Sequence, residues 1–313
     1  MTKTITLLTA ALMALSAYPA HAGYGRVVTL NMSYRISSEN ASGITLLSLV
    51  PRTLPGRQIV RDLSYFPEPS RVFDENGNRY AEFVIDDPGG GLTVRIDASV
   101  EILGYDLSSA SPIGSFNPFD DIRGSMEEES SRMELLVNEE LREKYLREER
   151  FLEKNHAAIA GAATLLYGFE DLETARKTYN FVLEKLTHLA YDIRDNGAVK
   201  VLGRRTGDCN DYSDLFVALL RANEVPARFV YGLVPASDGL PYHAWAEAFL
   251  EDYGWVPFDP LFGDLGAASF ERLPPVYIYL SRLRSDSLLN NGYYFTVRHQ
   301  GGSVRVDPFF TID

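Results

Sequence analysis

The 313-residue chain has only one cysteine, Cys209. A single cysteine cannot form an intramolecular disulfide, so the chain is not a disulfide-stabilised secreted domain. Together with five scattered histidines it gives no ligand spacing typical of zinc, and the segment Asp208-x-Asn210-x-Tyr212 departs from the calcium-loop pattern. We therefore predict neither a metal nor another cofactor.

An excess of basic charge is also missing. The chain has 43 acidic and 30 basic side chains, which gives a formal net charge of −13. Proteins that bind nucleic acid normally present a basic face that displaces counterions from phosphates. This balance predicts no nucleic-acid partner.

Long hydrophobic runs are absent as well. The only extended apolar run covers residues 5–17, which is too short for a membrane helix of about 20 residues. It follows Lys3 and precedes Ala20-His21-Ala22, a small-residue cleavage pattern. These features predict a signal peptide at residues 1–22, no membrane span, and a periplasmic or secreted protein.

Residues 23–107 are rich in β-branched and aromatic residues, arranged in short runs between turn signals. This pattern is typical of antiparallel strands. The sequence Asn76-Gly77-Asn78 supplies the positive-φ positions that a tight turn requires. We predict a small N-terminal β-sandwich, with strands at 26–36, 44–49, 82–85 and 92–103.

Residues 108–170 have a different composition and form a predicted helical linker. The segment 125–154 is strongly charged, with apolar residues near helical spacing, which predicts an amphipathic helix over at least part of it. We interpret its charges as a solvated face rather than a partner-binding surface.

Residues 171–313 show predicted helices followed by predicted strands. This order favours an α+β fold, with helices packed on an antiparallel sheet. The turn at 251–254 is expected to join two strands in a hairpin. The expected helices are 172–189 and 208–221, and the expected strands are 228–234, 243–250, 255–258, 276–280, 293–299 and 304–310.

Cys209 lies where a loop ends and the predicted helix 208–221 begins. The unpaired amides and the dipole at a helix N-terminus favour a thiolate. We interpret Asp208 as the N-cap, with Asp211 completing a capping box, so that Asp208 needs no catalytic role. The position of Cys209 therefore predicts a reactive thiol.

A thiolate nucleophile needs a partner that stabilises its charge and then protonates the leaving group, and histidine usually serves. His243 opens the predicted strand 243–250 directly after a loop, a common position for catalytic side chains. The other histidines are interpreted as structural, solvated or removed with the signal peptide: His21, His156, His188 and His299.

A carboxylate should complete the site by fixing the imidazole tautomer and stabilising the imidazolium. Asp259 is the favoured candidate, because it follows the second strand of the hairpin that begins with His243. Pro257 interrupts the strand ladder, so the register stays open. Asp264 and Asp307 therefore remain rival candidates.

Two segments, RTGDCNDYSDLFVALLRANEVPARFVYGLV and YHAWAEAFLEDYGWVPFDP, resemble the core of the transglutaminase-like superfamily over roughly residues 172–260. The resemblance depends on a combination of motifs: a cysteine that opens a helix, His243-Ala244-Trp245, and Gly254-Trp255-Val256-Pro257 before Asp259-Pro260. It implies a papain-like core at 171–313 with Cys209, His243 and Asp259 as the catalytic triad. The β-rich region also resembles the N-terminal β-domain of bacterial exported members, through residues 73–78.

The resemblance implies attack of the Cys209 thiolate on an amide carbonyl and a thioester intermediate. Water as acceptor would make the protein a hydrolase, whereas a lysine amine would make it a crosslinking enzyme. By analogy with the family we predict an exported cysteine peptidase or amidase that acts on a protein or peptide. The alternative is a non-catalytic exported binding module with the same fold.

Overall fold

The computed structural model of the chain describes residues 25–86, 91–110, 139–189, 195–235 and 241–313. The predicted signal peptide and the first part of the predicted helix 125–154 lie outside these residues. No helix in the described part of the chain is both long and apolar enough to cross a membrane. The chain divides into two compact units, which we call the β unit and the mixed unit.

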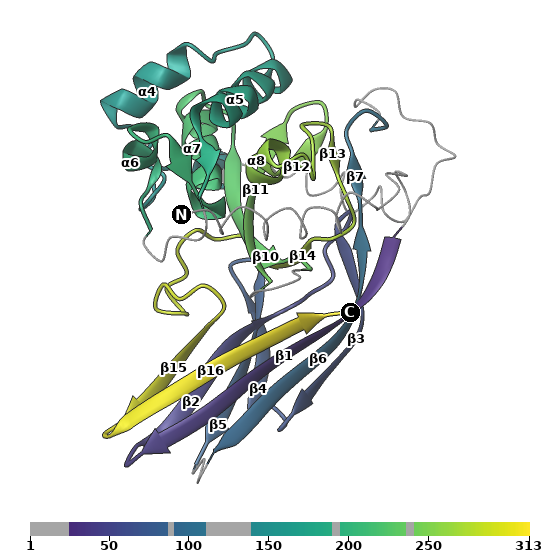
Figure 1. Cartoon of the computed structure of the whole chain (residues 1–313), viewed down its shortest axis with the longest axis vertical. Coiled ribbons are helices and arrows are strands. Elements are labelled where there is room, and N and C mark those ends of the chain that lie inside the picture. Colours follow the sequence, from purple (N-terminus) through teal and green to yellow (C-terminus); the bar gives the residue numbers. More distant parts are fainter. Residues whose placement is uncertain (1–24, 87–90, 111–138, 190–194, 236–240) are drawn as a thin grey trace, which may run out of the picture. The chain divides into compact units, whose positions relative to one another are not determined.

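The β unit contains residues 25–103, 231–242 and 275–313. Most of its strands form two four-stranded sheets, in the orders β16-β1-β6-β3 and β15-β2-β5-β4 (Figure 1). The strands of these sheets are β1 (Gly25–Glu39), β2 (Ser42–Val50), β3 (Gln58–Phe66), β4 (Arg71–Glu75), β5 (Asn78–Ile85), β6 (Leu92–Leu103), β15 (Phe295–Gln300) and β16 (Ser303–Ile312).

The alternation of buried and exposed residues along the strands explains why these two sheets form a sandwich. In β1 every second residue between Val28 and Ile36 is buried, as expected when one face of a sheet covers a core. Tyr34 of β1 shares a hydrogen bond of 2.7 Å with Ser48 of β2, and its ring packs edge-on against Phe295 of β15 at 5.0 Å. The two sheets therefore pack face to face, as predicted.

The predicted turn at Asn76-Gly77-Asn78 is also present. Asn76 and Gly77 have φ angles of 52° and 83°, and Glu75 pairs with Asn78 across the β4–β5 hairpin. Two consecutive positive φ angles are typical of the tight turns that match the twist of a hairpin. The Asn-Gly sequence therefore sets the register of this edge of the sandwich.

The last two strands of the chain pair differently from expectation. The strands predicted at 293–299 and 304–310 are expected to belong to the domain 171–313, but β15 pairs with β2 and β16 pairs with β1. The alternation of apolar and polar residues within a strand shows which face of that strand is buried. It does not show which distant strand is its pairing partner. The sandwich is thus built from both ends of the sequence.

The mixed unit contains residues 104–230 and 243–274. Its helices are α3 (Glu139–Leu146), α4 (Ala157–Thr164), α5 (Asp171–Lys185), α6 (Ala198–Leu202), α7 (Cys209–Ala222) and α8 (Pro260–Asp264). Its short strands are β7 (Tyr105–Asp106), β8 (Thr187–His188), β9 (Thr206–Gly207) and β13 (Arg272–Leu273). Its longer strands are β11 (Tyr242–Leu250), which begins with the last residue of the β unit, and β12 (Gly254–Phe258).

Helix α7 is the centre of the mixed unit. All residues from Asn210 to Arg221 are buried, and α7 contacts α4, α5, α6 and α8 (Figure 1). A helix buried on all sides belongs to the interior of a fold rather than to its surface. The residue that opens α7 is therefore held by the most constrained element of the unit.

A sheet with the order β12-β11-β10-β14 includes the remaining strands, β10 (Ala227–Leu233) and β14 (Ile278–Ser281). The last residues of β10 pair with β14 within the β unit. β11 and β12 form the predicted hairpin, with Leu250 opposite Gly254 and Ala246 opposite Phe258. This register leaves Asp259 just beyond the last paired residue of β12.

One predicted helix ends earlier than expected. α5 stops at Lys185 rather than at residue 189, and residues 187–188 form β8 instead. Within 125–154, where a helix is predicted over at least part of the segment, α3 ends at Leu146 and an isolated bridge joins Glu149 to Leu152. The strands β3 and β4 and the helices α6 and α8 are not predicted, whereas α4 lies within the predicted helical linker 108–170.

Candidate active site

Cys209 is the first residue of α7 and is partly exposed. Asp208 caps the helix, and its Oδ1 accepts hydrogen bonds from the amides of Asn210 and Asp211 at 3.0 and 3.1 Å. Asp211 completes the predicted capping box by accepting from the amide of Asp208 at 3.4 Å. The cap engages the second and third amides of α7, and the amide of Cys209 lies ahead of them at the helix N-terminus.

The segment before Cys209 is fixed by a two-residue parallel bridge. β8 pairs with β9, with His188 opposite Gly207. Gly207 leaves no room for a side chain, because a Cβ there would lie 2.7 Å from the Cβ of Asp211. A glycine at this position lets the chain run close against α7 and enter the helix at Cys209.

His243 and Asp259 form a buried pair. The Nε2 of His243 lies 2.6 Å from the Oδ2 of Asp259, and only 4% and 0% of the two residues is exposed. The other carboxylate oxygen of Asp259 accepts from the amide of Phe262 at 2.9 Å and so caps α8. The ring of Phe262 stacks on the imidazole with 4.2 Å between ring centroids. Asp259 and α8 thus fix the orientation of the imidazole.

Cys209 joins the pair of His243 and Asp259 through a side-chain hydrogen bond to His243. Since Nε2 is engaged by Asp259, Nδ1 is the ring nitrogen left for the thiol. Burial lowers the pKa of His243, but the charge and hydrogen bond of Asp259 and the interaction with Cys209 outweigh it and raise this pKa to about 10. The structure therefore brings the three predicted residues together, with an imidazole that favours its protonated form at neutral pH.

This arrangement supports nucleophilic chemistry at sulfur. A protonated imidazole stabilises an adjacent thiolate and can later donate its proton to a leaving group. The buried carboxylate stabilises the imidazolium and fixes which nitrogen faces the sulfur. The helix N-terminus adds a favourable electrostatic environment for negative charge.

The two rival carboxylates have other partners. Asp264 accepts a hydrogen bond from the hydroxyl of Tyr212 at 2.7 Å. Asp307 lies on β16 and pairs with Arg305 at 2.9 Å. Asp259 is thus the carboxylate that contacts His243.

Arg228 forms a buried ion pair with Glu247. Arg228 of β10 contacts Glu247 of β11 at 2.6 Å, and the guanidinium carbon lies 3.7 Å from the centre of the Trp255 ring. Both side chains are almost completely buried. These contacts give Arg228 a structural role within the mixed unit.

The remaining histidines of the described chain differ in their surroundings. His156 caps α4 by accepting from the amide of Ala158, and His299 contacts the carbonyl oxygen of Gly301 on an exposed strand. His188 was interpreted as part of a helix, but it lies on β8 beside the segment that leads into Cys209. The chain after Lys185 is extended where a helix is predicted, so the position of His188 differs from the prediction.

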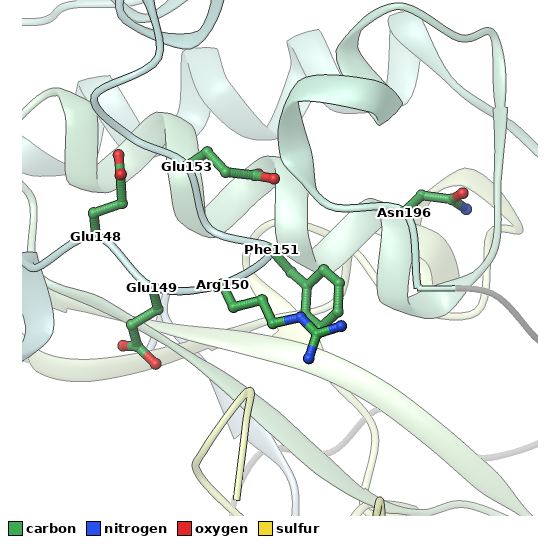
Figure 2. Close-up of a pocket in the computed structure, with 6 residues that line it drawn as sticks. All are labelled: Glu148, Glu149, Arg150, Phe151, Glu153 and Asn196. Atoms are coloured by element: carbon green, nitrogen blue, oxygen red, sulfur yellow. The ribbon is translucent and has the colours of Figure 1, made fainter. Parts of the chain in front are cut away.

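A separate acidic pocket of about 580 Å³ lies in the mixed unit (Figure 2). Glu149 on its wall pairs with Arg221 at 2.8 Å, and Asn196 donates a hydrogen bond of 3.1 Å to Asp211. Among the described residues, no group of three or more His, Cys, Asp or Glu side chains could hold a metal ion. The pocket is lined by Glu148, Glu149, Arg150, Phe151, Glu153 and Asn196, and so contains none of the three residues of the candidate site.

Part of the chain matches a known family. Residues 163–260 match the model of the transglutaminase-like superfamily, and this segment includes Cys209, His243 and Asp259. The chain carries a transglutaminase-like core. The mixed helix-and-sheet architecture described above is thus the α+β fold that the sequence predicted.

Other known proteins resemble the chain to different extents. The "Uncharacterized protein YebA" of Bacillus subtilis (strain 168) is 31% identical over 80 residues, a match that spans 21% of this chain and 11% of that protein. The crystal structure of a "Putative Cysteine Protease from Cytophaga hutchinsonii" has a TM-score of 0.60 at 14% identity and covers 93% of this chain and 91% of its own. That likeness shows a shared fold around the transglutaminase-like core.

A more distant structure is the periplasmic domain of TgpA from Pseudomonas aeruginosa bound to ethylmercury. It has a TM-score of 0.34 at 14% identity, over 72% of this chain and 91% of that domain.

Proposed function

We propose that the protein is an exported thiol hydrolase that cleaves amide bonds in peptides or proteins through Cys209, His243 and Asp259. The observation that carries the proposal is the position of His243, whose Nε2 contacts Asp259 and whose side chain also interacts with Cys209. A base held between a thiol and a carboxylate is the arrangement that activates a nucleophilic cysteine.

In the first half of the reaction the Cys209 thiolate attacks the carbonyl carbon of the substrate. The carbonyl π electrons move to oxygen, and the Cys209 amide donates a hydrogen bond to the resulting oxyanion. When the intermediate collapses, the carbon–nitrogen bond breaks and the imidazolium of His243 gives its proton to the leaving amine. The products are a free amine, a neutral imidazole and a thioester on Cys209.

In the second half water attacks the thioester. His243 takes a proton from the water, the carbon–sulfur bond breaks, and the thiolate leaves beside the newly formed imidazolium. A carboxylic acid product is released, and the starting ion pair is restored. Asp259 retains its charge throughout and stabilises the imidazolium in both halves.

Export of the protein is a second part of the proposal. It is supported by the apolar run at 5–17 and the small residues before Gly23. Expression of the full chain in a Gram-negative host should give a processed protein whose N-terminus is Gly23. A protein that retains Met1 in the cytosolic fraction would contradict export without affecting the proposed chemistry.

A peptide-library digest tests the hydrolase proposal. The wild-type protein and Cys209→Ala are incubated with a denatured proteome digest, and new termini are identified by mass spectrometry. We expect cleavage by the wild type alone, and an acyl adduct on Cys209 when the reaction is quenched in acid. Incorporation of ¹⁸O from labelled water identifies hydrolysis, whereas incorporation of an added primary amine in its place would identify acyl transfer. A wild type that forms neither products nor an adduct would favour the non-catalytic binding module.

A further inference from the structure

Acyl transfer sites commonly hold the developing oxyanion with a pair of hydrogen-bond donors. The amide of Cys209 is one donor in the proposed mechanism. The next two amides of α7 are engaged by the Asp208 carboxylate. A second donor must therefore come from another element that lies beside the entrance to α7.

The strand β8 is such an element, and it holds His188 in a defined place. The amide of Thr187 donates to the carbonyl of Arg205 at 2.8 Å, and the amide of Leu189 donates to the carbonyl of Gly207 at 2.9 Å. These bonds bracket His188 on both sides and place it opposite Gly207, two residues before the nucleophile.

One face of the β8–β9 bridge is turned toward α7, as the direction of a Cβ on Gly207 shows. A Cβ on Gly207 would meet the Cβ of Asp211 in the first turn of that helix. Paired residues of parallel strands lie about 4.8 Å apart and project from the same face of the bridge. The face of the bridge that His188 shares with Gly207 is therefore turned toward the first turn of α7.

The charges around His188 agree with this direction. Its imidazole interacts electrostatically with Asp264, with Asp208 and with the imidazole of His243, and α8 contacts β8. Asp264 is the last residue of α8, Asp208 is the N-cap of α7, and His243 lies in β11. His188 is half-buried, so its ring is partly removed from bulk water.

We propose that a ring N–H of His188 is the second oxyanion donor, opposite the amide of Cys209. This inference rests on the proposed function, because an oxyanion forms only if Cys209 attacks a carbonyl. The donor acts on the substrate oxygen, and its effect appears in acylation and deacylation, not in the reactivity of the thiol.

The protonation state of His188 suits this role. Burial lowers the pKa of His188, and the nearby carboxylates of Asp264 and Asp208 only partly oppose this effect. A neutral imidazole still carries one N–H and can polarise a carbonyl group without a positive charge of its own. The two histidines of the site would thus have different states, with His243 protonated and His188 neutral.

Two reagents separate the donor role from a structural one. Iodoacetamide reacts with the thiolate by displacement of iodide at an sp³ carbon, so no oxyanion forms. p-Nitrophenyl acetate reacts by attack at a carbonyl, and the carbon–oxygen bond breaks to give a thioester and p-nitrophenolate. Both rates are measured for the wild type, His188→Ala, His188→Gln and His188→Asn, with His299→Ala as a matched control on an exposed strand.

We expect His188→Ala to reduce the acylation rate about 10²- to 10³-fold, as loss of one oxyanion donor does, and to leave the alkylation rate within about twofold of the wild type. His188→Gln or His188→Asn should restore acylation to within about tenfold, because the amide nitrogen replaces one of the ring nitrogens as donor. His299→Ala should change neither rate.

Equal losses in both rates would overturn the donor assignment, since they would indicate that His188 only supports the fold or the thiolate. An unchanged acylation rate in His188→Ala would overturn it as well. A wild type that is alkylated rapidly but never acylated would contradict the proposed function itself, and the donor assignment would fall with it.

Discussion

Asp259 makes two hydrogen bonds with different purposes. Oδ2 contacts His243 at 2.6 Å, and Oδ1 accepts the amide that begins α8. An asparagine retains an oxygen for the cap but lacks the negative charge that helps raise the pKa of His243. Asp259→Asn and Asp259→Ala therefore separate catalysis from capping.

We expect both variants to lose about 10²- to 10⁴-fold in turnover, because the imidazolium loses its stabilising charge and its orientation. Asp259→Ala should also be less stable than Asp259→Asn by about 1 kcal/mol, the usual contribution of an N-cap. Chemical denaturation and a turnover assay on both proteins test this prediction. Turnover of Asp259→Asn at the wild-type rate would show that Asp259 only caps α8.

The sequence predicts the three residues of the candidate site because each has a local signal. Cys209 opens a helix, His243 opens a strand, and Asp259 follows the strand paired with it. His188 has no such signal, because its surroundings depend on a parallel bridge to Gly207. The high pKa of His243 also could not be predicted, since it requires knowledge of burial and of the distance to Asp259.

At the scale of elements, the ion pair between Arg228 and Glu247 joins β10 to β11 beneath Trp255. Removal of one partner from a buried pair leaves the other charge without compensation, which typically costs about 3–5 kcal/mol. We expect Glu247→Ala to lower the free energy of unfolding by this amount in urea titrations.

The exposed pair of Arg176 and Glu271 offers a matched control within the mixed unit. Exposed ion pairs contribute between about 0 and 1 kcal/mol, so Glu271→Ala should have a small effect. A loss below about 1 kcal/mol for Glu247→Ala would contradict the view that this pair holds the two strands together.

Elements were predictable where the burial pattern was strong. β1 and β6 alternate between buried and less buried residues, and their sequences show it. β3 and β4 have mostly exposed or half-exposed side chains, so their sequences show little hydrophobic periodicity. The helices α6 and α8 have five residues each, too few for a helical period to appear in the sequence.

For the whole molecule, the pairing of the chain ends could not be predicted. β16 joins β1 along ten consecutive residue pairs, from Leu30 and Ile312 to Glu39 and Ser303. The length and the alternation of both strands are visible in the sequence, but the choice of partner depends on packing in the finished sandwich. The same reasoning applies to β15 and β2.

The stability of the mixed unit should depend on pH through His243. The pKa of this residue is raised from its ordinary value of 6.5 to about 10 in the folded protein, so protonation favours folding. Protonated His243 makes its full contribution to the free energy of unfolding below about pH 6.5, and this contribution is lost as the pH rises toward 10.

Both tryptophans, Trp245 and Trp255, lie in the mixed unit, so intrinsic fluorescence reports its unfolding. We expect the urea midpoint of the wild type to fall between pH 6.5 and 10, and to fall less in His243→Gln. His299→Ala should follow the wild type. Parallel curves for the wild type and His243→Gln would show that the His243 pair does not couple to folding.

The central claim is that Cys209 exists as a thiolate paired with protonated His243, and the pH profile of its alkylation by iodoacetamide tests it most directly. We expect the wild type to be alkylated much faster than His243→Ala at pH 6 and pH 7. The rate of His243→Ala should be lower because this variant lacks the imidazolium that stabilises a thiolate beside it. A wild type whose profile matches that of His243→Ala would contradict the claim.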